Sequence, residues 1–113
     1  ILARWFSTYF LKYSADELQM WRSMLTRTTK SGYIGCCEAI SRCDLTEQAK
    51  IINLPTLVIV GEEDGSTPVN LVRDAANLIK NSVFKVIEKA GHLPCVEKPN
   101  EVGSTFMQFL ENN

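Results

Sequence analysis

Hydrophobic residues recur at steps of three and four along the first half of the chain, the spacing of one helix face. The opening segment predicts a single aromatic-rich helix whose apolar face carries Leu2, Trp5, Phe6, Tyr9, Phe10 and Tyr13. Ser14 and Glu17 have the spacing of a capping box and predict the start of a second helix. The predicted inward face of that helix consists of Leu18, Trp21, Met24 and Leu25. The helix is expected to end in the polar run 26–32. A third predicted helix has an apolar face of Tyr33, Cys36, Cys37, Ile40 and Cys43.

The pattern changes after Leu54-Pro55. Residues 56–60 form a continuous apolar and β-branched run ended by Gly61, which is typical of a strand buried on both faces. After an acidic loop, Thr67 and Pro68 predict a helix start, with Thr67 as N-cap and Pro68 at the first helical position. The predicted buried face of this helix consists of Leu71, Val72, Ala75, Ala76, Leu78 and Ile79. Asn81-Ser82 breaks the helix, 83–87 reads as a second strand, and a last helix begins near Pro99 with Val102, Phe106, Phe109 and Leu110 packed inward.

The order strand, helix, strand, helix predicts an α/β fold, because two strands joined by a helix must run parallel. Functional groups in such sheets lie beyond the carboxyl ends of the strands. Asp64 and His92 both follow a predicted strand, and the 28 positions between them (92 − 64) correspond to one strand–helix–strand unit. An acid and the histidine that it orients are two of the three members of a hydrolytic triad. We therefore expect Asp64 and His92 to form a catalytic pair.

Each of these assignments has an alternative. His92 is the only histidine, and a single histidine is more often a surface or core residue than a catalyst, so its context after Gly91 carries the argument. Glu62 and Glu63 are rival acids, or simply solvated charges of the loop. Asp64 is favoured over both because it occupies the motif position of the acid. The alternative for Asp64 is that it serves only as a turn residue.

Composition narrows the function classes. The 113 residues include 12 Lys+Arg and 13 Asp+Glu, so there is no excess of cations of the kind that binds nucleic acid. A hydrophobic content of 45% is typical of a globular chain, and neither a membrane-spanning run nor a signal-peptide pattern is found. The chain begins at Ile1 rather than Met, from which we expect that a segment has been removed upstream.

The four cysteines predict neither disulfides nor a metal site. Neighbours such as Cys36 and Cys37 rarely bond to each other, and the spacing of the set, completed by Cys43 and Cys95, matches no zinc pattern. We interpret them as reduced thiols in a cytoplasmic protein, with no metal bound. Nothing in the sequence around Cys36 and Cys37 indicates reactive thiols, so we assign the pair no function.

Several motifs carry a family resemblance. Val-Ile-Val-Gly-Glu-Glu-Asp (58–64) with the following Thr-Pro, Ala-Gly-His-Leu-Pro (90–94) and Glu-Lys-Pro (97–99) resemble the C-terminal half of an α/β-hydrolase. Leu-Ala-Arg-Trp-Phe (2–6) and Gly-Tyr-Ile-Gly-Cys-Cys-Glu-Ala-Ile (32–40) are similar to 3-oxoadipate enol-lactonases in particular. The resemblance implies that residues 1–53 form a helical lid and connecting helix. Residues 54–113 would be the C-terminal strand–helix–strand–helix part of the sheet domain.

One element of the family pattern is missing. The nucleophile elbow G-x-S-x-G, which holds the attacking serine, does not occur here with Ser or Cys at its centre. Residues 32–35 are no substitute, and neither Ser66 nor Ser104 has the flanking glycines. The resemblance therefore implies that the nucleophile and the oxyanion hole belong to a missing N-terminal half, and that this chain alone is inactive.

The reaction implied by the resemblance is hydrolysis of an enol-lactone to an oxo acid in the β-ketoadipate pathway of aromatic catabolism, with no cofactor. Arg4 could pair with the carboxylate of such a substrate, and Trp5 could contact it; the alternative is a solvated Arg4 and a Trp5 that is part of the lid core. Another α/β-hydrolase, such as an esterase or a carbon–carbon bond hydrolase, remains an alternative. So does a structural half that acts only by associating. The partners we expect are a small lactone or ester, the missing half and a second copy of the chain, and neither nucleic acid nor a membrane.

Overall fold

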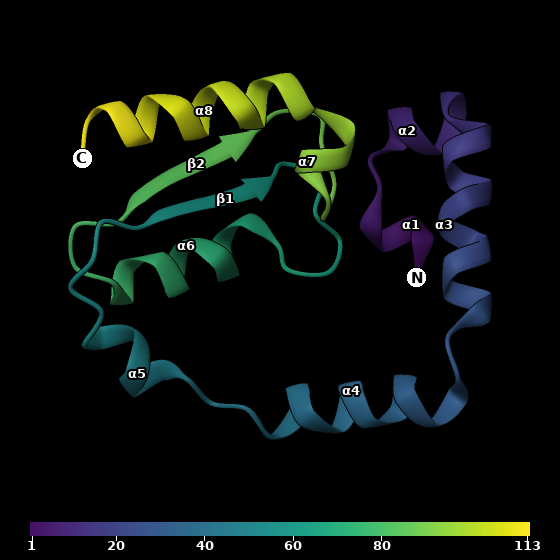
Figure 1. The fold of residues 1–113 in the computed structure, drawn as a ribbon, viewed down its shortest axis with the longest axis horizontal. Coiled ribbons are helices and arrows are strands. Elements are labelled where there is room, and N and C mark those ends of the chain that lie inside the picture. Colours follow the sequence, from purple (N-terminus) through teal and green to yellow (C-terminus); the bar gives the residue numbers. More distant parts are fainter.

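The computed structural model describes residues 1–113 and consists of a helical part followed by a small sheet with its helices (Figure 1). The helical part contains α1 (Leu2–Trp5), α2 (Thr8–Tyr13), α3 (Ala15–Arg27), α4 (Lys30–Arg42) and α5 (Thr46–Lys50). The sheet part contains β1 (Leu57–Gly61), α6 (Val69–Leu78), β2 (Val83–Ile87), α7 (Pro94–Glu97) and α8 (Pro99–Glu111). None of the helices is long and apolar enough to cross a membrane.

The two strands pair in parallel, as the strand–helix–strand order predicted. Their register runs from Leu57 opposite Val83 to Gly61 opposite Ile87. Helix α6 packs against one face of the pair and α8 lies along the other (Figure 1). Burial is greatest at the carboxyl ends of the strands, where Val60 and Ile87 are 3% and 0% exposed. The best-packed part of the sheet is therefore the end from which the two loops leave.

The prediction of one continuous helix over residues 2–13 is wrong. The backbone is extended at Phe6 and Ser7, and Ser7 caps α2 by accepting a hydrogen bond from the Phe10 amide at 3.2 Å. The bend separates the aromatic residues. Phe6 and Phe10 are buried and stack with their ring centroids 4.6 Å apart, whereas Tyr9 and Tyr13 are exposed.

Two predicted helix caps also differ. Ser14 does precede α3, but its side chain makes no capping hydrogen bond, so the capping box does not form. Pro68, not Thr67, is the N-cap of α6, because the Thr67 amide and hydroxyl both bond to Asp64. Leu71 and Ala75 are exposed rather than on the buried face of α6, and Ala76 is the one residue of α6 that is buried.

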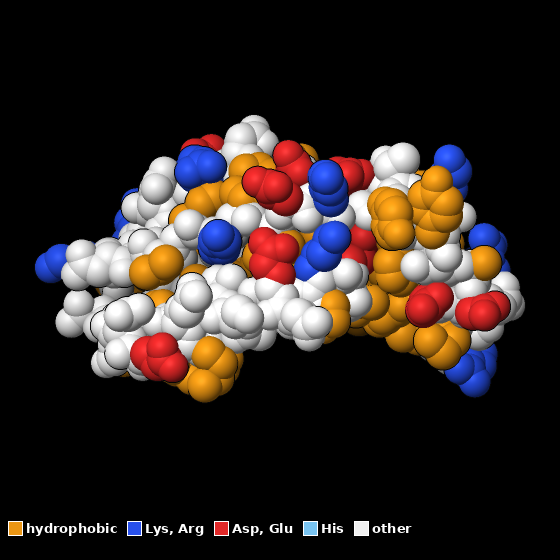
Figure 2. Space-filling view, turned by 90° about the horizontal axis from the view of Figure 1, so that it is seen from above, with side chains coloured by type: hydrophobic (Ala, Val, Ile, Leu, Met, Phe, Trp, Pro, Cys, Tyr) orange, Lys and Arg blue, Asp and Glu red, His pale blue; other side chains and the backbone are white.

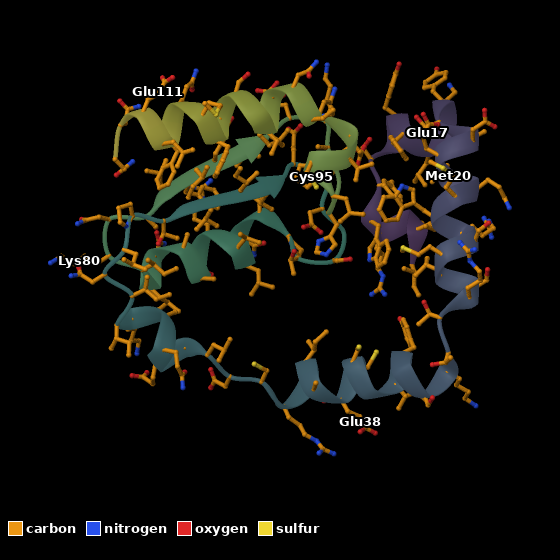
Figure 3. All side chains as sticks on the ribbon, viewed as in Figure 1. Glu17, Met20, Glu38, Lys80, Cys95 and Glu111 are labelled. Carbon is orange, nitrogen blue, oxygen red and sulfur yellow. The ribbon has the colours of Figure 1, made fainter.

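The helical part has little cover. All residues of α4 are exposed, including its predicted apolar face, and Glu38 points away from the rest of the chain (Figure 3). Figure 2 shows hydrophobic side chains gathered at the end of the molecule formed by α1 to α3. The exposed large side chains of these helices are Tyr9, Leu11, Tyr13, Met20 and Met24.

Candidate active site

Asp64 and His92 meet beyond the carboxyl ends of the two strands. Asp64 follows the end of β1 and His92 follows the end of β2, and parallel pairing brings both ends to the same edge. His92 Nδ1 lies 2.9 Å from Asp64 Oδ2. The topology thus brings together two residues that are 28 positions apart in the chain.

Asp64 is buried, with 8% of its surface exposed, and is surrounded by donors. Its Oδ1 accepts from the amides of Ser66 and Thr67, both at 2.8 Å, and its Oδ2 accepts from the Thr67 hydroxyl at 2.8 Å. Burial alone raises the pKa of the Asp64 carboxyl. Hydrogen bonds from the Thr67 amide, His92, the Thr67 hydroxyl and the Ser66 amide together outweigh burial and lower that pKa below its ordinary value of 3.8. Asp64 is therefore ionised at neutral pH.

The ionised carboxylate determines which imidazole nitrogen carries the proton. A carboxylate only accepts hydrogen bonds, so neutral His92 must place its hydrogen on Nδ1, the nitrogen that faces Asp64. The Thr67 hydroxyl, 3.2 Å from Nδ1, already donates to Asp64 and can only accept from the ring. Nε2 is left with a free lone pair, and the His92 side chain is one third exposed. This arrangement can accept a proton from a reacting group.

The rival acids lie elsewhere. Glu62 Oε2 accepts from the Lys89 amide at 2.9 Å, and Glu63 Oε2 accepts from the Thr8 amide at 2.8 Å. Neither carboxylate contacts the imidazole. Both instead join segments of the backbone around the pair.

Arg4 and Trp5 reach the site through their backbone. The Arg4 carbonyl accepts from the Gly65 amide at 3.1 Å, and the Trp5 carbonyl accepts from the His92 amide at 2.7 Å. The Trp5 ring lies beside the imidazole, with centroids 6.5 Å apart, whereas the Arg4 side chain is exposed. The opening segment is therefore attached to both loops of the pair, and a role for either side chain in substrate binding stays a prediction.

Two glycines allow the segments to approach this closely. A Cβ at Gly61 would lie 2.0 Å from the Gly91 carbonyl oxygen, and a Cβ at Gly91 would lie 2.4 Å from the Trp5 carbonyl oxygen. Neither glycine has a positive φ, so close approach rather than backbone conformation requires them. Strand β1, the His92 loop and the opening segment stack as successive backbone layers at these positions.

Sequence reasoning missed the roles of three residues at the site, Thr67, Ser7 and Glu97, although Thr67 and Glu97 belong to the motifs that carry the family resemblance. Thr67 was interpreted as a helix cap, although a threonine three positions after an aspartate is also typical of an Asp-led turn. Ser7 lies in the middle of a helical pattern, and Glu97 contacts it across 90 positions of the chain. No local signal indicates that contact.

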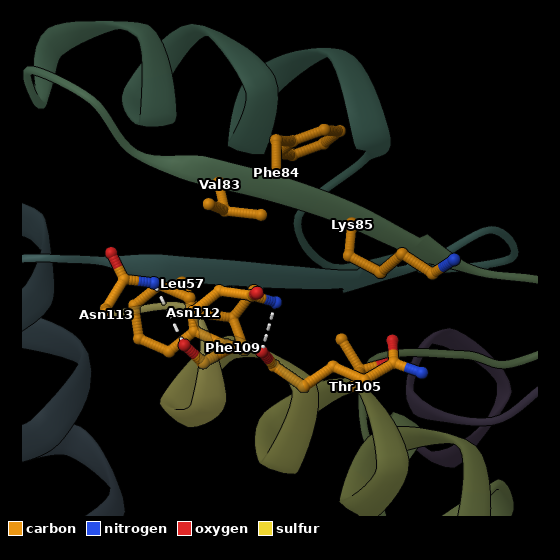
Figure 4. Close-up of a pocket in the computed structure, with 9 residues that line it drawn as sticks. Leu57, Val83, Phe84, Lys85, Thr105, Phe109, Asn112 and Asn113 are labelled. Atoms are coloured by element: carbon orange, nitrogen blue, oxygen red, sulfur yellow. Dashed lines mark hydrogen bonds between the residues drawn. The ribbon is translucent and has the colours of Figure 1, made fainter.

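A pocket of about 230 Å³ lies at the opposite, amino end of the strands, between them and α8 (Figure 4). Its apolar lining consists of Leu57, Val83, Phe84 and Phe109. The amide groups of Asn112 and Asn113 donate to the α8 carbonyls of Gln108 and Phe109, at 2.7 and 2.9 Å. These polar groups complete a helix end, and the pocket contains no acid–base pair. We therefore assign the chemistry to the Asp64–His92 edge.

A parallel strand–helix–strand unit with an acid–histidine pair at its carboxyl edge is the arrangement of a hydrolytic α/β protein. The sequence profile of the alpha/beta hydrolase fold matches residues 2–99, and the chain belongs to this family. Its elements are those of a C-terminal part of the fold.

Its relatives include enol-lactonases. The chain is 34% identical over 98 residues to 3-oxoadipate enol-lactonase 2 of Acinetobacter baylyi, which covers 85% of this chain and 36% of that protein. The crystal structure of the enol-lactonase from Burkholderia xenovorans LB400 superposes with a TM-score of 0.91 at 31% identity, over 97% of this chain and 42% of that one. A thermophilic esterase from Thermogutta terrifontis superposes with a TM-score of 0.85 at 27% identity, over 96% of this chain and 40% of that one. The chain thus spans less than half the length of these relatives.

Proposed function

We propose that this chain supplies the acid and the base of a serine-type lactone hydrolase whose substrate is 3-oxoadipate enol-lactone. The observation that carries the proposal is the Asp64–His92 pair, with an ionised acid, an Nδ1–H donor and a free Nε2. Similarity to two enol-lactonases supports the choice of substrate.

In the proposed reaction, a serine outside these 113 residues attacks the lactone carbonyl and gives its proton to Nε2 of His92. Asp64 stabilises the resulting imidazolium through Nδ1. Collapse of the tetrahedral intermediate breaks the ring C–O bond, and the departing enol oxygen takes the proton back from Nε2. His92 then activates a water molecule, which releases the acid from the serine. The enol tautomerises to the oxo acid, and no step requires a cofactor.

The test is a substrate panel on the full-length protein that contains this chain. It compares 3-oxoadipate enol-lactone with a neutral aryl ester and with a carbon–carbon bond substrate. We expect the highest kcat/KM for the enol-lactone. A protein that cleaves the neutral ester best would be an esterase, the second candidate, which the structural similarity to the Thermogutta terrifontis esterase favours.

The 113-residue chain by itself is proposed to be inactive. His92 alone offers at most general-base attack by water, without a nucleophile or an oxyanion hole. Adding the remaining part of the full-length protein as a separate polypeptide should restore turnover. Turnover by the isolated chain, abolished by His92→Ala, would contradict this part of the proposal.

A further inference from the structure

Glu97 ends α7, and its carboxylate receives hydrogen bonds from two segments that are remote from each other in the sequence. Oε1 accepts from the Gly91 amide at 2.8 Å and from the Ser7 amide at 3.1 Å. Oε2 accepts from the Ser7 hydroxyl and, at 3.3 Å, also from the Ser7 amide. One side chain therefore joins the bend between α1 and α2 to the loop that carries His92.

The donors that Glu97 satisfies are buried. Ser7 is 1% exposed and Gly91 is also buried, so neither amide can turn to water instead. The Ser7 hydroxyl donates to Glu97 and accepts from the Phe10 amide, which completes the cap of α2. Without Glu97, buried donors in both segments would lose their acceptor, and the two segments would lose the group that joins them.

These contacts form a closed path around His92. The Gly91 amide is tied to Glu97, and the His92 amide donates to the Trp5 carbonyl at 2.7 Å. Trp5 lies two residues before Ser7, which Glu97 also holds. The backbone on both sides of the imidazole is thereby fixed against the opening segment.

We propose that Glu97 is a positioning residue, which sets His92 at hydrogen-bonding distance from Asp64 by tying Gly91 to Ser7. Its importance for turnover rests on the proposed function, whereas its effect on the geometry of the pair does not. The pair is joined by a single 2.9 Å contact, and shortening the Glu97 side chain by one methylene withdraws the carboxylate by about 1.5 Å. Glu97 cannot then reach both segments, and His92 moves away from Asp64.

The experiment separates the reach of Glu97 from its charge and needs no turnover. Glu97→Asp keeps the charge and loses the reach. Glu97→Gln keeps the reach, since its amide oxygen can accept from both backbone amides and its NH₂ can donate to the Ser7 hydroxyl. Glu111→Asp is the matched control, because Glu111 points outward from α8 (Figure 3). The readouts, on the full-length protein that contains this chain, are amide hydrogen exchange and the imidazole Nδ1–H resonance of His92, which is assigned by its loss in His92→Ala.

We expect the Nδ1–H resonance in the unaltered protein, Glu97→Gln and Glu111→Asp, and its loss in Glu97→Asp. In Glu97→Asp the Ser7 and Gly91 amides should exchange at least about tenfold faster, while β1 and β2 keep their protection. Retention of the resonance in Glu97→Asp would overturn the proposal, as would its absence from the unaltered protein. Loss of the resonance in Glu97→Gln as well would overturn the proposal, because the charge of Glu97 and not its reach would then be required. Loss of amide protection throughout β1 and β2 in Glu97→Asp would also overturn it, because Glu97 would then stabilise the whole fold.

Discussion

The carboxylate of Asp64 is both buried and ionised, two properties that usually exclude each other. Its charge is tolerated because both oxygens are occupied by donors from Ser66, Thr67 and His92. Asp64 has four donors, and three of them come from the turn that follows it: the Ser66 amide, the Thr67 amide and the Thr67 hydroxyl. The turn therefore holds the acid in position before a substrate arrives, and His92 is oriented by a group that is itself rigid.

Replacement of the acid tests this arrangement. Asp64→Asn presents an amide whose NH₂ opposes Nδ1–H, so the imidazole must change tautomer or turn away. In the full-length protein we expect turnover to fall by about 10⁴-fold, which is the loss that the same exchange causes in a serine protease by favouring the wrong tautomer. Steady-state kinetics measures this, with Glu62→Gln as the control that should keep near-normal turnover. A loss of less than about tenfold for Asp64→Asn would contradict the assignment.

The lowered pKa of Asp64 predicts a pH dependence of stability. Because the folded-state pKa lies below the ordinary value of 3.8, the ionised carboxylate contributes its stabilisation fully above that value. The contribution is lost as the pH falls through the lowered pKa. The difference in free energy of unfolding between the unaltered chain and Asp64→Asn should shrink as the pH falls from about 4 to about 2. Urea unfolding across this range measures it, and a difference that grows on acidification would contradict the prediction.

Arg4 is an exposed cation in the segment that is attached to both loops. If its guanidinium pairs with the substrate carboxylate, Arg4→Ala in the full-length protein should raise KM for the enol-lactone by about tenfold or more and leave kcat nearly unchanged. The same variant should hydrolyse a neutral ester analogue normally. Equal losses for the charged and the neutral substrate would show that Arg4 acts on the structure instead.

At the scale of elements, the site depends on how closely the opening segment approaches the His92 loop. Gly91→Ala would place a Cβ 2.4 Å from the Trp5 carbonyl oxygen and 2.8 Å from Phe6 atoms, so the segment must move away. We expect a loss of stability of about 1–3 kcal/mol, similar to other overpacked sites, and a change in Trp5 fluorescence. Gly103→Ala is the control. It has open space around the added methyl group in α8 and should stabilise by about 0.5–1 kcal/mol. Equal melting temperatures for the two variants would contradict the close packing.

The elements that sequence predicted best are those whose pattern is local. Strand β2 coincides with the predicted range 83–87, and β1 differs from its predicted range by one residue at each end, because a continuous apolar run followed by turn residues has few other solutions. Parallel pairing then predicted that Asp64 and His92 would meet, and they do. The break at Phe6–Ser7 was not predictable, because the residues around it keep helical spacing. At the break, the Ser7 amide donates to Glu97, a partner 90 positions away.

Thr67 shows the same limit in a different way. Thr-Pro before an apolar run is a good helix-start signal, but the hydroxyl and the amide of Thr67 had a second acceptor available in Asp64. The sequence around Thr67 fits both a helix cap and a turn led by Asp64. The structure adopts the turn, in which both groups of Thr67 donate to the buried carboxylate. Helix α4 is the opposite case, since its apolar face was predicted and nothing in these 113 residues covers it.

At the scale of the whole molecule, the chain exposes much of what it would normally bury. The sheet has two strands, and two strands alone are marginally stable in water. Both outer edges present unpaired backbone groups that can pair with another chain. Large apolar side chains are also exposed along the helical part, among them Tyr9 at 65%, Ile40 at 75% and Ile51 at 80%.

From these surfaces we predict that the isolated 113-residue chain self-associates, either through a sheet edge or by exchange of the opening helices. Both routes bury apolar area that one copy leaves in water, so association should strengthen with concentration and with temperature near ambient. Light scattering across a dilution series measures the mass. A Glu or Lys substitution at Ile40 or Ile51 should lower the associated fraction if the helical face is used, and leave it unchanged if a strand edge is used. A monomer at every concentration with a cooperative melt would show that these residues close their own core, and the prediction would be wrong.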